Sequence, residues 1–356
     1  MSWRFFAAAF AALFAFAFTL TSGSACGAVL GFDRPGDAFE RSPGFHLDAA
    51  IHGDSPVGAS ARPPSVTEPA FRPTPEAFWD EKTIAITAGV FLGAPVVGYL
   101  EWWRTSSHSE FTVANERWFQ RDTYAGGADK ASHVFLGYFG TQMLQGAYRG
   151  VGKTPAESRA LALSVFALTG ALIEIGDGYS KYGFSWEDIT ANTIGSLVAT
   201  GIDAWGLKDT VGLRFGYVKA RIPDACCRYG GYGDDYSKEI YSADLKLSGF
   251  LPRLGLPAGP ARFLLLSMTY GSKGYRYSAA PLRERNVGVE IGLNLREVLR
   301  AVGVPEKPWW GKALLGIATY FRFPYASFGW HYDLNHGTWS GPDTGDRFDP
   351  GAIIYD

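Results

Sequence analysis

Residues 156–176 have the sequence AESRALALSVFALTGALIEIG, an apolar run whose second half carries one charged residue, Glu174. Pro155 precedes this run and Gly178 follows it. Apolar runs of this length between helix-breaking residues predict a helix. Three further segments have the same character: residues 83–100, 131–148 and 187–205. The sequence therefore predicts a bundle of four apolar helices over residues 82–207.

The chain after residue 207 changes to a two-residue period. In residues 287–296, Val, Ile and Leu alternate with Gly, Glu, Asn and Arg, which predicts a strand with one apolar face. Related runs lie at residues 211–217, 240–247, 261–270 and 313–323. The predicted fold class is α+β, with an antiparallel sheet or partial barrel of about five strands after the helices. Closed barrels have about eight strands or more, so we expect a sheet that packs on helices or lies on lipid.

The first 25 residues have the pattern of a secretory signal peptide. Arg4 precedes an apolar stretch, residues 5–20, and a small-residue stretch, residues 22–28, follows. A membrane-anchoring helix is the alternative, although a span needs about 20 apolar residues. We therefore expect an exported protein that is periplasmic or associated with the outer membrane. The remaining segments are predicted as a Pro- and Gly-rich linker (26–80), a membrane-associated helical bundle (81–207), a β-rich region (208–334) and a loose tail (335–356).

One cysteine is a candidate for lipid attachment, and the cysteines do not indicate a disulfide framework. Cleavage after Ala25 would leave Cys26 as the first residue, the position that carries lipid in bacterial lipoproteins. Gly23 stands where the lipid signal usually has Leu, so simple cleavage is favoured over lipidation of Cys26. Cys226 and Cys227 are adjacent, and neighbours of this kind rarely pair with each other.

The composition favours contact with lipid. The formal charge is −2, which gives no electrostatic basis for binding nucleic acid. Charged residues make up 19% of the chain and aromatic residues 15%, a low charge content for a soluble protein. Membrane lipid is the expected partner, with envelope proteins or a second copy of the chain as further candidates. Helices of this length are marginal for crossing a bilayer, so a membrane-embedded bundle and a soluble one both stay open.

Polar residues of the helical region gather at helix ends. They are Asp129, Lys130 and His133 at the start of the second helix, Glu174 and Asp177 at the end of the third, and Asp188 and Asn192 at the start of the fourth. Short connections make successive helices antiparallel. All three groups should then converge at one end of the bundle.

Three interpretations of this cluster remain open. It is a buried ion-pair network in which Lys130 neutralises Glu174 or Asp177, a site for a divalent metal or another ligand, or an acid–base pair. His133, Glu174 and Asp177 are the candidate metal ligands. The metal hypothesis is weakened because the cluster contains one His and no second nitrogen or sulfur ligand. Whether the protein is an enzyme stays undecided at this point.

The same residues resemble a known family. The resemblance is to the YfiM-type family of predicted periplasmic lipoproteins, a domain of unknown function, over about residues 110–300. It rests on Asp129-Lys130-Ala131-Ser132-His133, Glu174-Ile175-Gly176-Asp177-Gly178 and Phe184-Ser185-Trp186-Glu187-Asp188 with Asn192 and Gly195, preceded by Asn115-Glu116-Arg117-Trp118. A weaker likeness to VanZ-like membrane proteins rests on the Asp-Lys-x-x-His and Asp-x-x-x-Asn spacings. The resemblance implies an envelope location without an assigned activity.

Taken together, these features predict an envelope protein with a structural or binding role at a membrane. The alternative is a metal-dependent or acid–base enzyme that acts on a lipid or cell-wall substrate through the polar cluster. A third hypothesis is a module that binds a glycopeptide or a lipid head group at that end of the bundle.

Overall fold

The computed structural model describes residues 78–217, 236, 239–275 and 283–343. The expected signal peptide, Cys26, nearly all of the expected linker, and the Cys226–Cys227 pair lie outside the described residues. So do residues 344–356 of the expected tail.

Four long helices form the first part of the fold, as predicted. They are α3 (Glu81–Gly98), which continues into the π-helix η1 (Tyr99–Trp103), α4 (Ala128–Gly150), α5 (Pro155–Gly178) and α6 (Trp186–Ala204). Capping residues fix where the helices begin. Thr154 and Glu157 form a reciprocal capping box at the start of α5, and Ser185 accepts from the Asp188 backbone N–H at the start of α6.

Close backbone approaches hold α4 and α6 together. A Cβ atom on Gly137 would lie 2.1 Å from the carbonyl oxygen of Asn192, and one on Gly195 would lie 2.0 Å from that of Val134. Neither distance is sterically possible. The small residues of these helices therefore permit a contact that larger side chains would prevent.

Two of the four helices, α3 and α5, are long and apolar enough to cross a membrane, judged by length and composition. Within their most apolar windows, 17% of residues are buried in α3 and 33% in α5. Large apolar side chains on both helices are exposed, including Leu92 and Val96 on α3 and Leu168 on α5. These two helices thus present apolar surface that the described residues leave uncovered.

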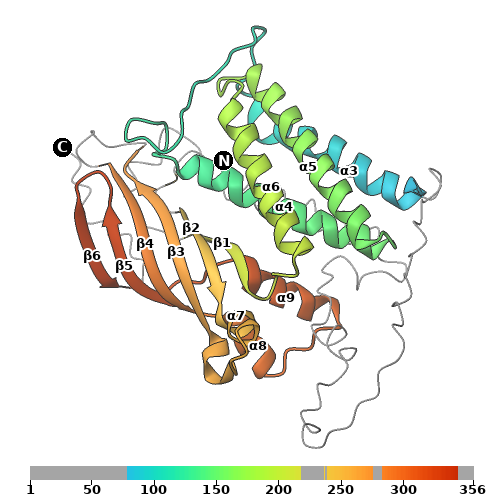
Figure 1. Cartoon of the computed structure of the whole chain (residues 1–356). Helices are drawn as coiled ribbons and strands as arrows, with labels where there is room; N and C mark the ends of the chain where they lie inside the picture. Colours follow the sequence, from blue (N-terminus) through green and yellow to red (C-terminus); the bar gives the residue numbers. More distant parts are fainter. Residues whose placement is uncertain (1–77, 218–235, 237–238, 276–282, 344–356) are drawn as a thin grey trace, which may run out of the picture.

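The second part of the fold is an open antiparallel sheet of six strands, one more than expected. Its order is β1-β2-β3-β4-β5-β6, so each strand pairs with its neighbours in the chain. Figure 1 shows β1 beside α4 and α6, and β6 at the opposite edge. The strands are β1 (Val211–Tyr217), β2 (Glu239–Lys246), β3 (Leu264–Lys273), β4 (Glu284–Leu293), β5 (Ser327–Asp333) and β6 (Thr338–Asp343). Strand β6 lies within the segment 335–356 that was expected to be loose.

The expectation of a strand at residues 313–323 is wrong. Helix α9 spans Trp309–Tyr320 instead, and strand β5 follows it at Ser327–Asp333. The run Ala313 to Phe323 is apolar without regular alternation, and such a run does not distinguish a strand from a buried helix. Three shorter elements complete the connections: α7 (Leu247–Arg253), the 3₁₀-helix η4 (Gly259–Phe263) and α8 (Leu295–Ala301).

The sheet buries its polar face. Arg214, Asp244, Ser267 and Glu290 are almost fully buried. Arg214 pairs with Asp244 through two bonds of 2.5 and 3.1 Å, and Ser267 donates to the same carboxylate. Arg322, just after α9, donates to Glu290 at 2.7 Å. Ion pairs and hydrogen bonds therefore satisfy the charges on this inner face.

The opposite face of strands β3, β4 and β5 is apolar and exposed. Met268 is 71% exposed, Val289 61% and Ile291 51%. Met268, Val289 and Trp330 occupy neighbouring strands in one row, and Leu266, Ile291 and Phe328 in the next. We call these six residues, with Leu293, the outer face.

The helices pack against the first strands of the sheet, β1 to β3. The Phe135 ring of α4 stacks on Phe215 of β1, with ring centroids 5.7 Å apart, and also contacts Tyr241 of β2. Phe321 packs against both Phe135 and Phe215. This aromatic core joins the helical region to one edge of the sheet and leaves the outer face uncovered by the described residues.

Candidate functional site

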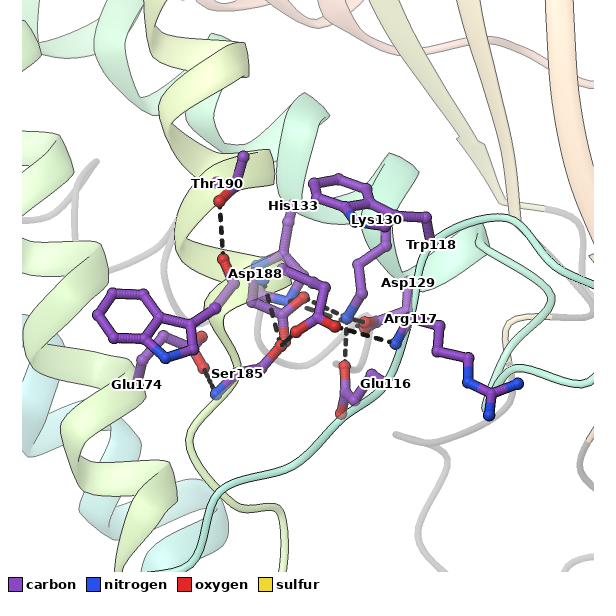
Figure 2. A network of polar contacts seen from close by, with 12 residues as sticks. Glu116, Arg117, Trp118, Asp129, Lys130, His133, Glu174, Ser185, Asp188 and Thr190 are labelled. Carbon is purple, nitrogen blue, oxygen red and sulfur yellow. Dashed lines mark hydrogen bonds and ion pairs between the residues drawn. The ribbon is translucent and has the colours of Figure 1, made fainter.

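The Lys130 side chain stands at the centre of the polar cluster. Its Nζ lies 2.7 Å from Asp129 Oδ2 and 2.6 Å from Asp188 Oδ1, and it also donates to Glu116 Oε2. Figure 2 shows these groups converging from α4, α6 and the loop that precedes α4. Three carboxyl groups thus surround one buried ammonium group.

Local structure places each member of the cluster. Gly127, with φ of 92°, precedes α4, and a Cβ there would meet the Phe119 ring at 2.3 Å. This turn puts Asp129 and Lys130 in the first helical turn. Asp188 lies in the first turn of α6 because Ser185 caps that helix. Negative charge is favourable at both helix starts.

His133 contacts the same carboxylates from one turn further along α4. Its Nε2 lies 3.3 Å from Asp188 Oδ1 and 3.7 Å from Asp129 Oδ1. Its Nδ1 is buried without a hydrogen-bond partner among the described residues. Burial lowers the pKa of His133 below its ordinary value, against the opposing effect of Asp129. The imidazole is therefore neutral near pH 7.

The carboxyl groups around Lys130 differ in their affinity for protons. Burial and the neighbouring carboxylate Asp129 raise the pKa values of Glu116 and Asp188, each to about 7. Burial acts on Asp129 too, but the charge and hydrogen bond of Lys130 outweigh it and hold the pKa of Asp129 below its usual range. Burial opposes the charge on Lys130, yet the three carboxylates raise its pKa. The cluster thus contains one ammonium group, one ionised carboxylate and two carboxyl groups that titrate together near neutral pH.

Glu174 and Asp177 lie beside this group and do not contact Lys130. Glu174 accepts from the Ser185 backbone N–H at 3.3 Å, and burial with the nearby charges of Asp188 and Asp177 raises its pKa to about 10. Asp177 accepts from the indole N–H groups of Trp102 and Trp103 at 2.9 and 2.7 Å. Burial raises the pKa of Asp177 to about 6, although both indoles oppose the rise.

These contacts correct one expectation. Lys130 pairs with Glu116, Asp129 and Asp188, and not with Glu174 or Asp177. Trp102 and Trp103 bind Asp177 instead. Asn192 is buried on α6, where its backbone carbonyl oxygen lies against Gly137 and accepts from Ser196.

Two members of the cluster were not predicted from the sequence. Glu116 comes from the loop before α4, although its segment is part of the family resemblance. The Tyr236 hydroxyl donates to Asp129 Oδ1. Nothing in the sequence around Tyr236 indicates this contact, because it lies 107 positions from Asp129.

The residues that could hold a metal ion are not the predicted set. Ligand atoms of Asp129, His133 and Asp188 lie within 4.8 Å of one another, whereas the prediction named His133, Glu174 and Asp177. The Lys130 ammonium group already contacts both aspartates of this triad. It occupies the position between the carboxylates that a cation would need.

Comparison with known proteins supports the family resemblance. Residues 115–202 match the family described as "Predicted periplasmic lipoprotein (DUF2279)". The matched segment includes Glu116, Asp129, Lys130, His133 and Asp188, so the whole Lys130-centred group apart from Tyr236 lies in the part of the chain that this family describes.

The DUF2279 match confirms the predicted resemblance over residues 115–202 and agrees with an exported, periplasmic protein. It begins after α3 and η1, covers α4, α5 and most of α6, and ends before β1. The match is therefore shorter than the expected resemblance over about residues 110–300. The likeness to VanZ-like proteins was not found. No curated protein and no solved structure matches the chain.

Proposed function

We propose that this protein is a non-enzymatic, membrane-associated component of the bacterial envelope. The outer face of its sheet would lie against lipid, and the polar cluster would hold the helical region together. The observation that carries this proposal is the reversed polarity of the sheet, which buries its charged residues and exposes its apolar ones.

The outer face has the properties of a lipid-facing surface. Six of its seven residues form two rows across three strands. A contiguous patch of this kind is larger than the single apolar residues that are scattered over ordinary protein surfaces. Lipid-facing strands have the same alternation of apolar outward and polar inward side chains. Removing one large apolar side chain from water contributes about 1.5–3 kcal/mol, so several together would give stable attachment.

Helices α3 and α5 support the same location independently. Both have the length and composition of membrane-crossing helices, and both expose apolar side chains. The family description, a periplasmic lipoprotein, is also compatible with attachment to a membrane.

The polar cluster supports a structural role. Lys130 is 2% exposed and Glu174 is 2% exposed, so solvent and substrates have little access to them. The cation within the cluster comes from the protein itself. A buried network of this kind joins α4, α6 and the preceding loop without requiring a ligand.

Flotation of the purified chain with neutral phosphatidylcholine vesicles tests the proposal. The wild-type protein is expected to float, and the double variant Val289→Glu with Ile291→Glu is expected to stay at the bottom of the gradient. Both positions are exposed, so the charges should not disturb the folded protein in solution. Ser340→Glu, at an exposed position of edge strand β6, is the matched control and should float.

Two results would contradict the proposal. Wild-type protein that fails to bind vesicles would remove the membrane role, and equal binding by the double variant would show that the outer face takes no part. Circular dichroism of each variant verifies that a loss of binding does not reflect unfolding.

A further inference from the structure

We infer that the end of the sheet formed by residues 247–263 and 294–312 docks on an anionic phospholipid membrane, with its basic side chains at the phosphate groups. This inference rests on the proposed membrane function and specifies which end of the protein meets the headgroups. Figure 1 shows α7 and α8 together at one end of the sheet.

The two segments form one continuous structure. The first connects β2 to β3 and the second follows β4, so both emerge from the same end of the antiparallel sheet. The Asn294 backbone N–H donates to the Phe263 carbonyl oxygen at 2.7 Å, and the Asn294 side chain donates to Ser248 Oγ at 3.3 Å. We call this structure the basic tip.

The basic tip carries a charge opposite to that of the whole chain. The two acidic residues in its segments are Glu297 and Glu306, whereas the basic ones are Arg253, Arg262, Arg296, Arg300, Lys307 and Lys312. The tip is therefore +4, while the complete protein is −2. Anionic lipid surfaces attract clustered Lys and Arg residues of this kind.

Large apolar side chains are exposed among these charges. Val302 is 72% exposed, Leu254 58% and Trp309 52%, and Leu256 and Trp310 are also exposed. Trp beside Lys and Arg is typical of the interface between lipid and water. A bilayer surface has an apolar layer where the acyl chains begin and an anionic layer at the phosphates. Exposed apolar and basic side chains on one protein surface match these two layers.

A hollow at the base of the tip does not add to this positive charge. Its lining includes three basic side chains, Arg214, Lys246 and Arg296, and three acidic ones, Asp209, Asp244 and Glu297. The two bonds from Arg214 and one from Ser267 already engage the Asp244 carboxylate. The lipid phosphates would therefore lie at the exposed basic side chains of the tip, such as Arg262 and Lys307.

Vesicle binding tests this inference separately from the proposed function. The wild-type protein should bind vesicles of phosphatidylcholine with phosphatidylglycerol at least about tenfold more tightly than phosphatidylcholine alone at low salt, and the difference should shrink as salt rises. Arg262→Glu with Lys307→Glu should abolish this difference and leave binding to neutral vesicles unchanged. Arg121→Glu with Lys181→Glu makes the same charge change at exposed positions outside the tip and should retain the difference.

The possible outcomes bear differently on the two proposals. Equal binding to neutral and anionic vesicles by the wild-type protein would overturn the inference and leave the membrane function standing. Absence of binding to both would overturn both. Binding to anionic vesicles that depends on the tip but not on Val289 and Ile291 would support the inference and overturn the role of the outer face. Loss of anionic binding in millimolar inorganic phosphate at constant ionic strength would identify free phosphate, not lipid, as the ligand and would overturn the inference.

Discussion

The Lys130 ammonium group lies 2.6 Å from Asp188 Oδ1, although the two residues are 58 positions apart in the chain. This ion pair joins the first turn of α4 to the first turn of α6. Glu116, in the loop before α4, binds the same Lys130 Nζ atom. This one nitrogen therefore attaches the loop to both α4 and α6.

Replacing Lys130 should therefore destabilise the whole helical region. The Lys130→Met variant leaves buried carboxyl groups without their cation, and breaking a buried pair in this way costs about 3–5 kcal/mol. Urea unfolding followed by circular dichroism measures the loss. Lys181→Met, an exposed lysine, is the control and should change the free energy of unfolding little. The double variant Lys130→Met with Asp188→Asn should recover part of the loss, and an unaltered stability of the single variant would contradict the structural role of the cluster.

Much of this cluster was predictable from the sequence because the positions of helix ends can be predicted from it. Asp129, Lys130, His133 and Asp188 lie at the starts of two helices whose limits follow from apolar runs and helix breakers, and antiparallel packing brings those ends together. Glu116 was missed because its loop has no periodicity from which a direction can be inferred. Tyr236 was missed because its contact depends on how the sheet packs against α4.

The sheet shows a different limit. Alternation in residues 287–296 identifies a strand with one polar and one apolar face, but it does not tell which face is buried. That choice depends on partners far away in sequence: Arg322 pairs with Glu290, and Arg214 with Asp244. Once those pairs fill the inner face, Val289 and Ile291 must point outward. The location of an ion-pair partner, and not the strand pattern, decides the polarity.

The position of Lys130 also predicts how the cluster responds to metal. Asp129, His133 and Asp188 have suitable ligand atoms, but the ammonium group lies between the two carboxylates. Isothermal titration of the wild-type protein with Zn²⁺ should show no stoichiometric site. Lys130→Ala vacates this position and should create a site, which His133→Ala in the same background should remove. Stoichiometric binding by the wild-type protein that His133→Ala abolishes would favour the alternative of a metal centre.

Glu174 should make the protein less stable as the pH rises. Its carboxyl group has a pKa of about 10 in the folded protein because of burial and the charges of Asp188 and Asp177, whereas an unfolded Glu titrates near 4.3. Between these values the unfolded chain has released a proton that the folded protein keeps. The contribution of Glu174 is therefore fully present below the unfolded pKa and is lost toward pH 10, at up to about 1.4 kcal/mol per pH unit.

The variant Glu174→Gln isolates this effect because an amide resembles the protonated carboxyl group. Unfolding free energies at about pH 7.5 and pH 9 should fall less in the variant than in the wild-type protein. Comparing the two slopes cancels other groups, such as Lys246, whose pKa of about 8 acts in the opposite direction in both proteins. Glu110→Gln, at an exposed position, should retain the wild-type slope. Identical slopes for Glu174→Gln and the wild-type protein would contradict the prediction and mean that Glu174 is already ionised in the folded protein. A charged Glu174 beside Asp188 would then need a neutralising cation, which the described residues do not supply.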